Sequence, residues 1–174
     1  MDDKHLLTKS DVIGLVREFA QYRQEGGDSF DQHHLDEGLW LYASDDVRVG
    51  ILVAGEENQW RIAVYSAARV RMRATYELYR YVSRWRTTIK AGAPYVVEEG
   101  EWAAVMCETG FRHGQLIGRE PSMALIRTTV DTIAQVSEEL SQALRNADGT
   151  PFTATGAAGA ALLLSWWQIF DESI

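Results

Sequence analysis

The densest cluster of residues that could do chemistry is the stretch DQHHLDEG, residues 31–38. It places His33 and His34 among carboxylates, and imidazole and carboxylate groups bind zinc and other transition metals. Neighbouring side chains in an extended segment point in opposite directions, so the two histidines are poorly placed to bind one ion. The HExxH and paired-cysteine spacings of zinc sites are absent. We therefore expect a solvated loop without metal or cofactor, and keep an enzyme that uses the His33/His34 loop as an alternative.

Two other reactive side chains stand apart from this cluster. Cys107 lies in the apolar run WAAVMCE, which predicts a buried, unreactive thiol. His113 follows Arg112 in GFRHGQ, where arginine and backbone amides could hold an anion. However, the phosphate-loop, GxGxxG and GxSxG spacings are all absent, so a turn is the simpler interpretation. No catalytic residue is predicted, and the chain is expected not to be an enzyme.

Basic residues are concentrated between Arg69 and Lys90. This stretch holds seven basic residues and one acidic residue, a net charge of +6. Because the net charge of the whole chain is −8, the remainder of the chain has a net charge of −14. Tyrosines alternate with the arginines, and both residue types are common where proteins bind each other. We predict a surface for another protein or peptide, with an ordinary solvated helix face as the alternative. The candidate partner-binding residues are Arg73, Tyr76, Arg80, Arg84, Trp102, Leu163, Trp166, Trp167 and Phe170.

Composition limits the function classes. An isoelectric point near 5.0 argues against general nucleic-acid binding, because phosphate would be repelled. A single cysteine excludes a disulfide within the chain and favours a cytoplasmic location. The N-terminal residues lack the apolar region of a signal peptide. The uncharged run 149–170 is rich in small residues and has acidic flanks, so no membrane association is expected.

Hydrophobic periodicity predicts an α+β domain. A helix over 9–24, capped by Thr8 with Asp11 three residues later, leads into a loop at 25–38. Strands at 39–44, 47–54 and 60–66, the last extending to about 71, form an antiparallel meander with one covered face. A helix over 73–87, a hairpin of 94–98 and 101–109, and a long helix over 122–146 follow. The order α-βββ-α-ββ-α predicts an antiparallel sheet with helices packed on it, plus an apolar C-terminal segment.

The C-terminal segment, residues 150–174, is predicted to be an extension of a domain formed by residues 1–149. Its apolar residues would make an isolated tail prone to aggregation, so it should pack on the sheet, on the long helix or in a subunit interface. Leu163, Trp167 and Phe170 share roughly one helical face and are the expected anchors.

Residues 73–146 resemble the second half of YbjN-like proteins. The resemblance rests on a helix with Trp85 near its end, a hairpin that begins near APYV at 93–96, and the long helix SMALIRTTVDTIAQVSEELSQAL. It implies the fold of type III secretion chaperones, a frequently dimeric α/β sandwich that binds another protein. The loop 25–38 and the segment after Gly149 depart from that pattern.

The leading hypothesis is a non-enzymatic protein-binding domain, chaperone-like or regulatory, that forms a homodimer. An immunity protein that neutralises a toxin enzyme is the alternative, because such proteins are also small, acidic and rich in tryptophan. These two differ in their partner: an extended client segment for the first, a folded enzyme for the second.

Overall fold

The computed structural model describes residues 6–34, 39–44, 47–88 and 92–172; within these, it gives side-chain surroundings for all except 29–34, 39–44, 47, 87–88 and 170–172. The elements along the chain are α1 (Lys9–Glu25), β1 (Ser29–His34), β2 (Leu39–Ser44), β3 (Val47–Glu56), β4 (Gln59–Arg73), α2 (Tyr76–Thr88), β5 (Ala93–Glu99), β6 (Trp102–Arg112), α3 (Arg119–Ala143), β7 (Thr150–Pro151) and α4 (Gly156–Glu172).

The predicted fold class is confirmed, with an antiparallel sheet and the predicted elements in their predicted order. The stretch 25–38, expected to be a loop, contains β1, which pairs with β2 at the edge of the sheet. Its sequence SFDQHH has no apolar alternation, so periodicity gives no sign of a strand there. The helix predicted from residue 73 begins at Tyr76, because β4 continues to Arg73.

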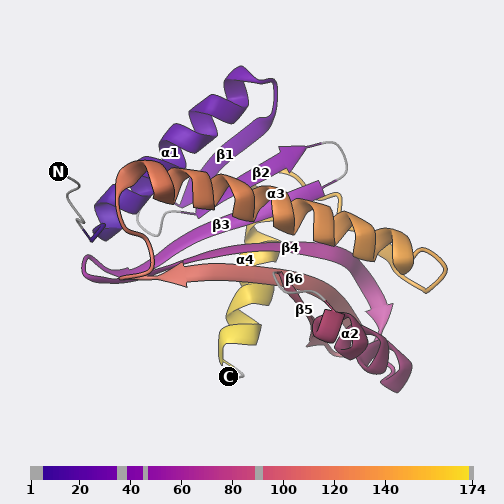
Figure 1. The fold of residues 1–174 in the computed structure, drawn as a ribbon. Coiled ribbons are helices and arrows are strands. Elements are labelled where there is room, and N and C mark those ends of the chain that lie inside the picture. The colour runs from indigo at the N-terminus through magenta and orange to yellow at the C-terminus, as the bar shows by residue number, and fades with distance from the viewer. Residues whose placement is uncertain (1–5, 35–38, 45–46, 89–91, 173–174) are drawn as a thin grey trace.

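The sheet runs in the order β1-β2-β3-β4-β6-β5, with every neighbouring pair antiparallel (Figure 1). Strand β4 is the longest and lies at its centre. The pairing of β3 with β4 ends at Ser66, and the two residues of β7 then pair with Arg69 and Val70 of β4 on that side. The last part of β4 therefore lies between β6 and β7.

Helices α1 and α3 cover one face of the sheet (Figure 1). A capping box begins α1: the Thr8 hydroxyl accepts from the Asp11 amide, and the Asp11 carboxylate accepts from the Thr8 amide. The seam of α3 is buried rather than exposed, and its polar member Ser137 bonds to Ser66 of β4 through their hydroxyls at 2.9 Å. Trp60, Ile62 and Val64 alternate on this face of β4, as predicted.

Helix α4 covers the second face, crossing the sheet from β1 to β5. The prediction of one covered face was therefore wrong. The intervening positions of β4, Ala63, Tyr65 and Ala67, are buried against α4 together with Leu163 and Trp167. Because both faces are covered, the centre of β4 is continuously buried, which the alternation of Trp60, Ile62 and Val64 alone does not reveal.

In the described part of the chain, no helix has both the length and the hydropathy needed to cross a membrane.

Candidate binding groove

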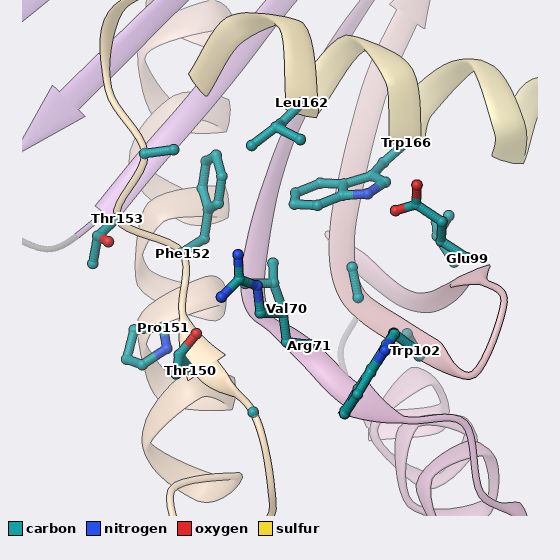
Figure 2. A pocket seen from close by; sticks show the side chains of 15 residues that line it. Val70, Arg71, Glu99, Trp102, Thr150, Pro151, Phe152, Thr153, Leu162 and Trp166 are labelled. Carbon is teal, nitrogen blue, oxygen red and sulfur yellow. The ribbon is translucent and has the colours of Figure 1, made fainter. Parts of the chain in front are cut away.

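Helix α4 leaves part of the second sheet face open near the end of β4 and the β5–β6 turn. A cavity of about 820 Å³ lies there, within the size range of ligand sites (Figure 2). Its lining comes from β4, β5, β6, the β7 segment and α4: Val70, Arg71, Val97, Glu99, Trp102, Ala103, Ala104, Gly149, Thr150, Pro151, Phe152, Thr153, Ala154, Leu162 and Trp166. We call this cavity the α4 groove.

One wall of the α4 groove is the segment that contains β7, and several polar contacts hold it against β4. The buried Arg69 guanidinium donates to the carbonyl oxygens of Gly149, at 2.8 Å, and of Ser141 in α3, at 3.2 Å. The Asp148 carboxylate accepts from the Arg73 amide at 2.9 Å. At Gly149, with φ +94°, an added Cβ would lie 2.7 Å from the Val70 carbonyl oxygen. The close approach of this wall therefore depends on a glycine.

Arg71 enters the α4 groove through an irregular part of β4. Relative to β6, the register shifts between Ala67 and Arg69 and again between Arg69 and Met72. Arg71 has φ +54°, the left-handed region that costs a non-glycine residue about 1–2 kcal/mol. Bulges re-aim side chains, and Figure 2 shows the Arg71 side chain pointing from β4 into the cavity.

Aromatic side chains form much of the remaining wall. Phe152 and Trp166 meet edge to face, with ring centroids 5.5 Å apart. Trp102, which is 47% exposed, lies directly across from Arg73 in the β4–β6 pairing, and the Arg73 guanidinium stands 5.7 Å from its ring centroid. Large aromatic surfaces beside an arginine are typical of sites where a protein binds a partner.

The chemistry of the lining suits binding. Arg71 supplies one positive charge and Glu99 one negative charge, and Figure 2 places Glu99 beside Trp166. Thr150 and Thr153 add hydroxyl groups. The lining contains no histidine or cysteine, and among the described residues no three His, Cys, Asp or Glu side chains gather as a metal site. An apolar groove with a few placed polar groups can orient a ligand.

The structure divides the predicted partner-binding residues into four groups. Trp102 and Trp166 line the α4 groove, and Arg73 stacks beside it. Tyr76, Arg80 and Arg84 are exposed on α2. Leu163 and Trp167 are buried between α4 and the sheet, so they hold α4 in place rather than face a partner. Phe170 belongs to α4, but its side chain lies outside the described part of the structure.

A partly buried polar cluster joins α4 to the sheet. The Glu108 carboxylate accepts from the Trp167 indole and from the Tyr95 hydroxyl, both at 3.2 Å. Burial, followed by the nearby Glu108 charge, raises the pKa of Tyr95 and of Tyr65 well above the usual range. The Tyr65 hydroxyl is buried and has no hydrogen-bond partner among the described residues.

The other candidate residues are resolved in part. Cys107 is fully buried, as predicted, and burial raises the pKa of its thiol to about 12. The His113 amide donates to the Trp60 carbonyl oxygen at 2.9 Å, and its ring packs edge-on against the Trp60 ring. His33 and His34 belong to β1, but their side chains are outside the described part of the structure.

Sequence reasoning missed Arg71 and Phe152 as lining residues. Arg71 was counted only as part of the basic stretch, since neither of the two bulges that turn it into the cavity has a sequence signal. Phe152 follows Gly149 in the segment GTPF, and this glycine was a signal for a close turn. Arg69, from the same basic stretch, is buried and does not line the α4 groove.

The fold is similar to that of YbjN from E. coli, a protein suggested to regulate transcription. The crystal structure of YbjN superposes with a TM-score of 0.55 at 13% sequence identity, over 79% of this chain and 96% of YbjN. This likeness shows a YbjN-like fold, as the resemblance predicted, and at this identity it shows the fold alone. No protein-family model matches the sequence, and no match is found among curated proteins.

Proposed function

We propose that this chain is a non-enzymatic binding protein, chaperone-like or regulatory, that holds a segment of another polypeptide in the α4 groove. The observation that carries the proposal is the groove itself: about 820 Å³ of space beside α4 on the second sheet face, walled by Trp102, Phe152 and Trp166. A suggested role of YbjN in transcription regulation is compatible with a regulatory binding role here.

The position of Trp102 supports a polypeptide ligand. The Trp102 ring is 47% exposed and lines the cavity, so its apolar surface is in contact with water. Covering this surface with a partner would be favourable. Rigid aromatic side chains provide contact area at a low entropy cost, because few of their torsions must be fixed on binding.

A peptide-display selection tests the proposal. Random 12-residue peptides would be selected on the wild-type chain, synthesised, and measured against wild type and a Trp102→Ser variant. We expect at least a tenfold loss of affinity in the variant, since the main exposed aromatic contact is removed. Tyr76→Ser is the matched control: it removes an aromatic residue that is 74% exposed, more than Trp102, from α2 and outside the groove lining.

Two outcomes contradict the proposal. One is a selection that yields no binder. The other is a set of binders whose affinity falls with Tyr76→Ser and not with Trp102→Ser, which would move the binding surface to α2.

A further inference from the structure

We propose that Arg71 binds a carboxylate side chain within an extended peptide segment, and that this contact makes the α4 groove selective for acidic peptides. This inference rests on the proposed function and adds the chemistry of the partner. The backbone at Arg71 has a φ of +54° and lies between two shifts of the β4–β6 register. Such strain persists only where the surroundings impose it, and it is concentrated at binding sites.

The neighbouring arginines of β4 have structural partners. Arg69 is buried and donates to two backbone carbonyl groups, while Arg73 stacks on Trp102. Arg71, by contrast, makes no ion pair with any residue that the structure describes, and its side chain points into the cavity (Figure 2). The groove therefore presents one guanidinium whose donors can bind a ligand.

A planar guanidinium matches a carboxylate, which it binds through two parallel hydrogen bonds. Arg71 is exposed, so its donors are accessible to a ligand, and the apolar surfaces of Val70, Phe152 and Trp166 line the same groove. Glu99 limits the charge of the ligand: a second negative charge near Trp166 would be repelled, so a single carboxylate is favoured over a phosphate dianion.

The proposed occupant of the groove is an acidic side chain with an apolar neighbour in an extended segment. The Arg71 side chain provides the charged contact, and the surfaces of Trp102 and Trp166 provide apolar contacts for adjacent residues. The volume of about 820 Å³ exceeds what one acidic side chain fills, so adjacent residues of the segment share the groove.

The test compares peptide selections on wild type and on Arg71→Gln, using 12-residue libraries displayed without a free C-terminus. We expect Asp and Glu to be enriched among peptides selected on wild type and not among those selected on the variant. For one synthesised binder with blocked termini, replacing its acidic residue by the matching amide should weaken binding to wild type about tenfold. The same replacement should leave binding to Arg71→Gln unchanged.

Further measurements distinguish a side-chain carboxylate from a C-terminal carboxylate. They also distinguish a failure of this inference from a failure of the proposed function. An amide-substituted peptide with a free C-terminus that binds as tightly as the acidic peptide would overturn the side-chain assignment. Binders that depend on Trp102 but show no acidic preference would overturn this inference and leave the proposed function standing. Arg71→Gly, which suits the left-handed backbone, serves as a second variant: retained acidic selectivity in a folded Arg71→Gly protein would also contradict the role of Arg71.

Discussion

The Arg71 side chain is expected to favour ligand binding while its backbone conformation lowers the stability of the fold. Glycine adopts a φ of +54° without the steric cost of about 1–2 kcal/mol that arginine meets. Its entropic cost of about 0.5–1 kcal/mol offsets part of this gain, so Arg71→Gly should raise the free energy of unfolding by roughly 0.5–1 kcal/mol. Urea unfolding monitored by circular dichroism measures this change.

Arg73→Gly is the matched control for that experiment. Arg73 is also a β4 arginine, but it lies outside the left-handed region, so glycine there should lower stability by about 0.5–1 kcal/mol. A loss of stability in Arg71→Gly equal to that in Arg73→Gly would show that Arg71 is not strained.

Tyr65 offers a second test at the residue scale. Its buried hydroxyl has no hydrogen-bond partner among the described residues, so Tyr65→Phe removes an uncompensated polar group and should stabilise the protein by about 1 kcal/mol. Tyr95→Phe is the control, because it removes a hydrogen bond to Glu108 and should lower stability by a similar amount. Equal effects of the two substitutions in chemical unfolding would contradict this assignment.

Sequence reasoning predicted Trp102 and Trp166 of the groove lining and did not predict Arg71. Trp102 and Trp166 were candidates because aromatic residues at strand edges and chain ends often face partners. Leu163 and Trp167 are predicted both as anchors of the C-terminal segment and as partner-binding residues. They are buried against the sheet as anchors, since helical periodicity says which residues share a face and not what that face meets. The direction of Arg71 depends on a local register shift with β6, which only the three-dimensional pairing defines.

Among the elements, α4 is expected to be held against the sheet in part by the hydrogen bond of Trp167. The Trp167 indole donates to Glu108, and the Arg61 guanidinium stacks 4.4 Å from its ring centroid. Trp167→Phe keeps an aromatic ring but leaves a Glu108 oxygen without this donor, so amides of α4 should exchange with deuterium about five- to tenfold faster, as expected for about 1 kcal/mol. Hydrogen–deuterium exchange with mass spectrometry measures this.

Trp166→Phe provides the comparison. Trp166 is similarly buried on α4, but no hydrogen bond from its indole to a described residue is present, so the substitution costs packing alone. If both variants accelerate exchange in α4 to the same extent, the Glu108 contact does not fix the helix.

Elements with strong periodicity were predictable, and those defined by their neighbours were not. The capped start of α1, the alternating strand β4 and the seam of α3 each carry their own pattern, and each was predicted close to its observed bounds. Strand β1 is a polar edge strand that exists through its pairing with β2. Strand β7 has two residues, and it pairs with β4 because Gly149 lets the chain come close to β4.

The whole molecule should lose stability at alkaline pH. Burial raises the pKa of Cys107 from 9.0 to about 12 and raises the pKa values of Tyr65 and Tyr95 from 10.0. The unfolded chain releases these protons first, so the stabilisation is complete below about pH 9. It is lost as the pH rises, by up to about 1.4 kcal/mol per pH unit for each group.

Urea unfolding between pH 8 and pH 11 measures that dependence. A Tyr65→Phe/Tyr95→Phe double variant should show a shallower slope above pH 10, because two of the three groups are absent. An identical slope in the wild type and the double variant would show that these tyrosines do not control alkaline stability.

The two covered sheet faces give the molecule its candidate function. Helices α1 and α3 cover one face, and α4 crosses the other face with the α4 groove beside it. The α4 groove is the proposed binding space for a polypeptide.

The most direct measurement is fluorine NMR of protein labelled with 5-fluorotryptophan, titrated with a peptide selected on the wild-type chain and assigned by single Trp→Phe variants. The account predicts that the signals of Trp102 and Trp166 shift together and saturate, while that of Trp60, buried on the opposite sheet face, stays in place. Saturable binding that shifts the Trp85 signal of α2 and leaves Trp102 and Trp166 unchanged would contradict it.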